Sequence, residues 1–294
     1  MSSTTGTKNT MHNEYELLDS GEGRKLERFG DVILSRPCAQ AVWEQQKPEV
    51  WSKAHGSFDR EQGWQTYDSG ELPSSWIVTI NDVAMRLTPT PAGHLGVFPE
   101  TRHLWGWITD TLNSPAGRRA NVLNLFAYSG GATLAAARAG CRVCHVDSSK
   151  SMVTRARENA GLNQLDEAPI RWIVDDVGRF LDREIRRGRE YDAIMLDPPS
   201  FGHGTRGEQY RIDKDLALTL RRCGALLTDE PAFVLLTSHT RGVTTAQLET
   251  LMSDVLGPGD IASGEMELTG AGDVRAVNDG VWVRWTRSRR TGPG

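Results

Sequence analysis

From residue 121 onward, short apolar runs alternate with segments of helical character, and this rhythm constrains the fold more than any other feature. Several helical segments are followed by a glycine, a common residue just beyond a helix C-terminus. Strands that alternate with helices are typical of a parallel, doubly wound sheet, so we expect an α/β fold here. The leading runs span residues 121–127, 142–146, 169–174, 191–196 and 232–237, and two further strands are expected near 264–268 and 281–286.

The preceding part of the chain has a different pattern. Residues 14–92 carry short strand-like runs broken by turn residues, such as 75–80 and 84–87, and no long helical period. They predict a small, mostly β N-terminal region. Residues 1–13 are polar and are expected to form a disordered tail, and residues 93–294 are expected to form the α/β domain.

The amino-acid composition excludes several classes of protein but does not identify the function. The 294 residues include 34 Lys plus Arg and 38 Asp plus Glu, a formal net charge of −4. That balance excludes a protein that binds polyanions through bulk charge, but it leaves a local basic face open. No apolar run is long enough to span a membrane, the N-terminus lacks a signal-peptide core, and four cysteines are too few for a disulfide scaffold. We therefore expect a cytoplasmic protein with no membrane partner.

The ends of the expected strands carry the residues that could bind a ligand, because ligands bind beyond the carboxyl ends of parallel strands. Ser129, Gly130 and Gly131 follow the first strand and would let a ligand approach the backbone at a helix N-terminus. Asp147 ends the second strand, where Rossmann-like units place the acid that binds ribose hydroxyls. Taken separately, the glycines fit a tight turn and Asp147 fits a helix-terminal acid.

The first strand-to-helix turn lacks a complete phosphate-binding fingerprint. Ala127 and Tyr128 stand where a GxGxxG motif would begin with glycine. A pyrophosphate needs that close backbone approach, so a nucleoside without phosphates is favoured over NAD or FAD. S-adenosylmethionine is such a nucleoside, and its sulfonium suits a site of carboxylates and aromatic faces.

Two further strand ends suggest contacts to a base and to an acceptor. Asp175 and Asp176 follow the third strand, where one carboxylate could accept from an adenine amino group and the other could cap the next helix. The fourth strand ends in Asp197-Pro198-Pro199-Ser200-Phe201. Two prolines give the chain a stiff exit from the sheet, which would direct the Asp197 carboxylate and the Pro198 carbonyl at an amine. Phe201 would stack on a planar ring, although the segment also fits a plain strand exit.

Four segments of the chain together resemble the class I S-adenosylmethionine-dependent methyltransferases. They are NLFAYSGG (124–131), HVDSSKSMVTRARENAGLN (145–163), IVDDVGRFL (173–181) and LDPPSFG (196–202). They are most similar to the branch that includes the bacterial 23S ribosomal RNA large-subunit cytosine-C5 methyltransferases and uncharacterised relatives. GVFPE (96–100) is similar to that branch's short motif before the first strand. The resemblance covers about residues 93–245 and implies a Rossmann-like sheet of seven strands, the last antiparallel.

The resemblance also implies roles for the strand-end residues. Asp147, with Ser148, would hold the ribose of S-adenosylmethionine, and Asp176 with Val177 the adenine. Asp197, Pro198 and Phe201 would orient the acceptor, with Asp197 also beside the cofactor. The residues expected around the methionine part and the sulfonium are Phe98, Glu100, Phe126, Tyr128, Ser129, Gly130 and Gly131.

The chain departs from that branch at the fifth strand. The cytosine-C5 enzymes resemble one another in a cysteine after this strand, whereas here it ends in Thr237-Ser238-His239. Methylation at carbon 5 needs such a nucleophile, so a nitrogen or oxygen acceptor is expected instead. Cys223 and the pair Cys141 and Cys144 are expected in the core, and no metal site is expected.

The acceptor itself stays open. The resemblance favours an RNA base, while the acidic net charge favours a small molecule. Two other possibilities are an enzyme that uses S-adenosylmethionine for intramolecular chemistry and a non-catalytic protein that senses it. The roles of His203 and His239 and the oligomeric state are not decided by the sequence.

Overall fold

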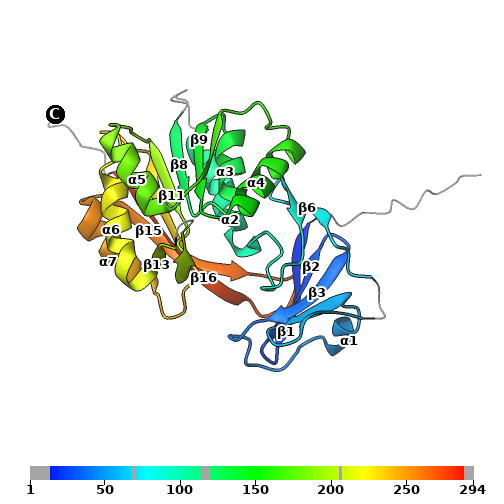
Figure 1. Ribbon diagram of the computed structural model, residues 1–294. Coiled ribbons are helices and arrows are strands. Elements are labelled where there is room, and N and C mark those ends of the chain that lie inside the picture. Colours follow the sequence, from blue (N-terminus) through cyan, green and yellow to red (C-terminus); the bar gives the residue numbers. More distant parts are fainter. Residues whose placement is uncertain (1–13, 68–70, 114–119, 205–206, 288–294) are drawn as a thin grey trace, which may run out of the picture. The chain divides into compact units, whose positions relative to one another are not determined.

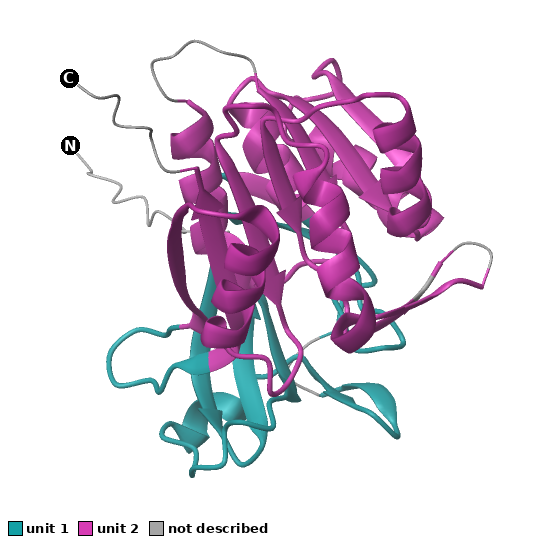
Figure 2. Cartoon of the chain, turned by 90° about the vertical axis from the view of Figure 1, so that its left-hand side faces the viewer, with its two compact units in different colours: residues 1–82, 86–95, 269–277 teal, residues 83–85, 96–268, 278–294 magenta. Residues whose placement is uncertain are grey.

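The computed structural model describes residues 14–67, 71–113, 120–204 and 207–287, so the expected tail at 1–13 lies outside the described residues. The chain divides into two compact units (Figure 2). Unit 1 comprises residues 1–82, 86–95 and 269–277, and unit 2 comprises residues 83–85, 96–268 and 278–294.

Unit 1 is built on a five-stranded sheet in the order β1-β2-β3-β4-β5, in which only the β3–β4 pair is parallel. Leu17 of β1, Leu26 of β2 and Leu34 of β3 are fully buried, and the pairing of Glu27 with both Leu17 and Leu34 places these two leucines on one face of the sheet. The mostly β N-terminal region is therefore confirmed. Its elements are β1 (Tyr15–Gly21), β2 (Arg24–Phe29), β3 (Val32–Pro37), α1 (Pro48–Trp51), β4 (Gly56–Asp59), β5 (Gly63–Thr66) and β6 (Trp76–Ile80). The next strand, β7 (Val83–Leu87), is divided between the units, because residues 83–85 belong to unit 2.

Unit 2 is built on a seven-stranded sheet in the order β10-β9-β8-β11-β14-β16-β15. Its first five strands in this order run parallel, and β16 pairs antiparallel with β14. The predicted sheet is confirmed. The strand order reverses between β8 and β11, which is where ligands bind in open α/β sheets. The strands are β8 (Asn121–Leu125), β9 (Arg142–Asp147), β10 (Ile170–Val174), β11 (Ala193–Leu196), β14 (Phe233–Ser238), β15 (Asp260–Leu268) and β16 (Val277–Thr286).

Helices cover both faces of this sheet, with α2, α3 and α4 on one side and α5, α6 and α7 on the other (Figure 1). Local capping explains where several begin: Ser149 accepts the Met152 amide, Asp176 accepts the Arg179 amide, and Thr244 forms a capping box with Gln247. The elements are η1 (Pro99–Thr101), α2 (Arg102–Leu112), α3 (Gly131–Arg138), α4 (Lys150–Leu162), α5 (Val177–Arg186), α6 (Ile212–Gly224) and α7 (Thr245–Leu256), with a hairpin of β12 (Phe201–His203) and β13 (Gln209–Arg211) before α6.

The core of unit 2 lies between the central strands and the helices, where Leu123, Ile194 and Val234 are fully buried. These strands are apolar on both faces, as expected for parallel strands covered on both sides. In the described parts of the chain, no helix has the length and apolar character needed to cross a membrane.

Candidate active site

The turn between β8 and α3 has an unusual backbone. Phe126, Tyr128 and Gly130 all have positive φ angles, of 53°, 48° and 95°. A non-glycine residue in this region is uncommon and strained, and such residues cluster at ligand sites. The Tyr128 amide donates to Asp147 Oδ2 at 2.8 Å, and the Ser129 hydroxyl donates to the Gly96 carbonyl. The turn is therefore fixed from both sides.

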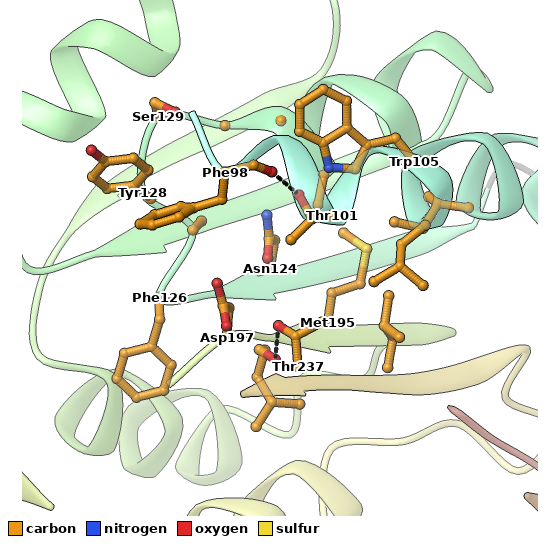
Figure 3. A pocket seen from close by; sticks show the side chains of 18 of the residues that line it. Phe98, Thr101, Trp105, Asn124, Phe126, Tyr128, Ser129, Met195, Asp197 and Thr237 are labelled. Carbon is orange, nitrogen blue, oxygen red and sulfur yellow. Dashed lines mark hydrogen bonds between the residues drawn. The ribbon is translucent and has the colours of Figure 1, made fainter. Parts of the chain in front are cut away.

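A pocket of about 80 Å³ lies at this turn (Figure 3). Asn124 and Asp197 bring polar atoms to it from neighbouring strands, and Trp105, Met195 and Leu235 form apolar parts of its wall. Predicted site residues that line it are Phe98, Phe126, Tyr128, Ser129, Gly130, Gly131 and Asp197. The sequence did not identify Asn124, Trp105 or Met195, because all three belong to regular elements with no unusual local pattern.

Asp147 lies beside the pocket, at the end of β9. Its Oδ1 accepts the Ser149 amide at 2.8 Å, and Oδ2 accepts the Tyr128 amide. Burial raises the pKa of Asp147 above its ordinary value, although these two hydrogen bonds oppose the rise. Each oxygen keeps a further lone pair, so the side chain can still accept from a ligand hydroxyl. Ser148 follows it and is half-buried.

At the end of β10 the two aspartates have separate partners. Asp176 Oδ1 caps α5 by accepting the Arg179 amide, and Asp175 pairs with Arg183 and with Arg179. The Val177 side chain is buried in the core. Any contact of Val177 with a ligand would therefore have to come from its main chain.

Asp197 follows β11, and the buried Pro198 comes next. Asp197 Oδ1 is shielded from solvent and has no hydrogen-bond partner among the residues that the structure describes. A buried carboxylate oxygen without a partner is costly, which makes it a candidate ligand contact. Phe201 starts the β12–β13 hairpin with 51% of its surface exposed. The side chain of His203 lies outside the described residues.

His239, at the end of β14, lies between two carboxylates. Its Nδ1 is 3.4 Å from Glu100 Oε1 and 2.9 Å from the Asp279 carbonyl, and its Nε2 is 3.5 Å from Asp197 Oδ2. The Phe98 ring lies against the imidazole, with centroids 5.0 Å apart. We call Glu100, His239 and Asp197 the ion cluster. Glu100 was expected near the cofactor; in the structure it contacts His239 and is 4% exposed.

The ion cluster sets the protonation of its members. Burial alone would lower the pKa of His239, but Asp197, Glu100 and the Asp279 carbonyl raise it to about 10. Burial alone would raise the pKa of Asp197, but His239 and the Thr237 hydroxyl bring it below its ordinary value. At neutral pH the imidazole is therefore charged and Asp197 is ionised.

The cysteines lie in the core. Cys141, Cys144 and Cys223 are buried free thiols, and burial raises the pKa of Cys144 to about 11 and of Cys223 to about 12. Such thiols are poor nucleophiles and metal ligands at neutral pH. Within the described ranges, no group of three His, Cys, Asp or Glu side chains could hold a metal ion.

A protein family and two curated proteins that are similar to this chain are all described as methyltransferases. The sequence profile of a family described as S-adenosylmethionine-dependent methyltransferases matches residues 52–248. The ribosomal RNA large subunit methyltransferase I of Cronobacter sakazakii is 27% identical over 253 residues, 78% of this chain and 60% of that protein. The corresponding protein of Escherichia coli SMS-3-5 is 28% identical over 64% of this chain and 52% of that protein. The chain thus spans little more than half the length of these two curated relatives.

Two solved structures are similar to this chain over more than nine-tenths of its length. The S-adenosylmethionine-dependent methyltransferase from Agrobacterium tumefaciens has a TM-score of 0.89 and 37% identity, covering 93% of this chain and 90% of that one. The structure of SMU.776 complexed with SAH has a TM-score of 0.74 at 18% identity, covering 94% and 76%, and supports the fold alone.

Proposed function

Because the chain belongs to the S-adenosylmethionine-dependent methyltransferase family, we propose that it transfers a methyl group from S-adenosylmethionine to a nitrogen or oxygen atom of an RNA base. The ribosomal RNA methyltransferases among its relatives support RNA as the acceptor. The observation that carries the proposal is Asp197 Oδ1, which has no hydrogen-bond partner among the described residues and lies beside the pocket, at the point where the strand order reverses. An RNA substrate also fits the cytoplasmic location expected from the sequence.

The residues at the strand ends fit this cofactor. Asp147 would accept the ribose hydroxyls, and Asp176 with the main chain of Val177 would bind the adenine. Phe98, Tyr128 and the glycines of the β8–α3 turn would surround the methionine part, with Ser129 fixing the turn. The strained φ angles of Phe126 and Tyr128 are consistent with a backbone shaped around a ligand.

When bound, the cofactor supplies a methyl group on a positively charged sulfur. The protein's own residues would then position the acceptor, since transfer of this kind is promoted mainly by alignment. Asp197 Oδ1 and the Pro198 carbonyl would accept hydrogen bonds from it. Phe201, half-exposed on its hairpin, would stack on the base.

Two variants separate cofactor binding from transfer. Asp147→Ala is expected to weaken S-adenosylmethionine binding about tenfold or more, because the ribose hydroxyls lose a charged acceptor. Asp197→Asn is expected to leave binding within about threefold and to lower turnover at least about tenfold. Binding is measured by calorimetry, and turnover by release of S-adenosylhomocysteine with ribosomal RNA. Equal losses of binding and turnover in both variants would contradict these roles.

A small-molecule acceptor is the second candidate, and the net charge of −4 favours it. S-adenosylhomocysteine formed with a metabolite extract and not with RNA would support this candidate and overturn the RNA proposal. Methylthioadenosine as the product would instead indicate intramolecular chemistry. Absence of S-adenosylmethionine binding would overturn the whole assignment.

A further inference from the structure

We infer that the ion cluster of Glu100, His239 and Asp197 selects a neutral amino nitrogen, rather than a hydroxyl oxygen, as the methyl acceptor. In this inference His239 is a positioning residue: it acts on the acceptor through Asp197. The inference rests on the proposed methyl transfer and names the acceptor atom at the same site.

The three members come from different segments, and each is held in place. Glu100 lies in η1, His239 follows β14 and Asp197 follows β11. The loops that carry the last two are joined by a 2.7 Å hydrogen bond between the hydroxyls of Ser200 and Thr240. The imidazole also lies against Phe98, which lines the pocket. A geometry fixed from this many sides preorganises Asp197 before an acceptor arrives.

Two carboxylates and one main-chain carbonyl face His239, each from a different segment. Glu100 faces Nδ1, Asp197 faces Nε2, and the Asp279 contact is made through its main-chain carbonyl. With the imidazole protonated, Nδ1–H can donate to the Asp279 carbonyl, whereas Nε2 lies 3.5 Å from Asp197 Oδ2 as an ion pair and has no hydrogen-bond partner among the described residues. The ring then has no lone pair with which to take a proton from a substrate, so His239 cannot act as a general base.

Such a site suits one kind of acceptor. A hydroxyl is a weak nucleophile until a base removes its proton, and Asp197, whose pKa is lowered by His239, is a weak base for a neutral hydroxyl. An amino group is neutral, and it can donate an N–H to Asp197 Oδ1, which no other group in the described part of the chain contacts by a hydrogen bond. The nitrogen lone pair forms the new N–C bond while the carbon–sulfur bond breaks with both electrons staying on sulfur. The surplus N–H proton passes to the Asp197 carboxylate and then to water.

The position of the methyl group tests the acceptor atom. Unmethylated 23S ribosomal RNA transcribed in vitro is incubated with the full-length protein and S-adenosylmethionine, then digested to nucleosides for mass spectrometry. We expect a methyl group on an exocyclic amino nitrogen. Methyl on a base oxygen would overturn the inference and leave the proposed function intact, whereas methyl on a ring carbon or a ribose oxygen would overturn both. Methylation of a small amine but not of RNA would overturn the RNA proposal and leave the nitrogen acceptor intact.

The pH profile of His239→Asn tests the positioning role. Without the imidazolium, burial dominates at Asp197 and raises its pKa. The acidic limb of kcat is therefore expected to move up by about one pH unit or more, because Asp197 must be ionised to accept the N–H of the acceptor. His94→Asn, at an exposed histidine of unit 1, is the matched control and should keep the wild-type profile.

The two readouts separate positioning from general destabilisation. S-adenosylmethionine affinity of His239→Asn, measured by calorimetry, is expected to stay within about threefold of wild type. An unshifted acidic limb in a variant that still binds the cofactor would overturn the role of His239. If His239→Asn does not fold, the nitrogen chemical shifts of the wild-type imidazole decide: a ring that titrates near pH 6.5, the ordinary histidine pKa, would also overturn it.

Discussion

His145 is a fully buried histidine that no proposed step uses. It lies in β9, where its Nδ1 is 3.0 Å from the Thr133 hydroxyl, which in turn accepts from Asn124. Nε2 is buried without a hydrogen-bond partner in the described part of the chain, and burial lowers the pKa of the ring to about 3. Between about pH 3 and pH 6.5 the imidazole is therefore neutral in the folded protein, whereas in the unfolded chain it is charged.

This linkage makes the fold sensitive to acid. Because the folded pKa lies below the unfolded value of about 6.5, the stability is complete above that pH and is lost as the pH falls toward 3. Between pH 7.5 and pH 5 this group alone should cost about 2 kcal/mol. His145→Gln keeps a polar side chain and removes the titration. Urea unfolding at both pH values should show a smaller acid loss in the variant, and equal losses would contradict the assignment.

At the scale of elements, the sequence identifies the features that depend on neighbouring residues along the chain. Ser149 and Asp176 are recognisable as helix N-caps because capping depends on the three following residues. The strands that carry Asp147 and Asp197 are likewise recognisable from their apolar runs. The ion cluster is different, because its members lie on segments far apart in sequence and meet only through the strand order and the placement of η1. The sequence alone therefore did not decide the role of His239.

The packing of α3 on α2 gives a prediction at the same scale. A Cβ added at Gly131, the first residue of α3, would lie 2.2 Å from Trp105 Cζ2, whereas one added at Gly106 in α2 would meet nothing within 4 Å. Gly131→Ala should lower the free energy of unfolding by about 1–3 kcal/mol through overpacking and should weaken cofactor binding. Gly106→Ala should raise it by up to about 1 kcal/mol. Urea unfolding followed by circular dichroism measures both, and a neutral Gly131→Ala would contradict the close approach.

At the scale of the whole molecule, unit 1 is discontinuous in sequence. Residues 269–277, which follow β15 and include the first residue of β16, belong to it: Gly270 bridges Leu17 of β1, and Arg275 contacts both Ser20 and Trp43. The β character of residues 14–92 follows from their own alternation and turns. The residues 269–277 carry no local pattern that indicates their contact with β1. Such a contact depends on the path of the chain through the folded protein rather than on the local structural propensity of the segment.

The contact at Gly270 can be tested within the intact protein. A Cβ there would lie 2.4 Å from the Leu17 carbonyl oxygen and 2.7 Å from Val274 Cβ, and neither atom is the free end of a flexible side chain. Gly270→Ala should therefore loosen β1, and a cost of about 1–3 kcal/mol corresponds to amide exchange that is faster by about five-fold to a hundred-fold. Hydrogen exchange of β1 and β2 reports this directly, with the amides of β8 as the internal reference.

Gly272 provides the control for that experiment. It lies in the same segment with a φ of 69°, a Cβ added there would meet nothing within 4 Å, and asparagine tolerates that backbone. Gly272→Asn should therefore leave the exchange of β1 close to wild type. Faster exchange in Gly270→Ala alone would mean that the returning segment stabilises the N-terminal sheet through close contact at one residue. Equal exchange in the two variants would mean that β1 is stable without it, and that residues 269–277 merely follow its edge.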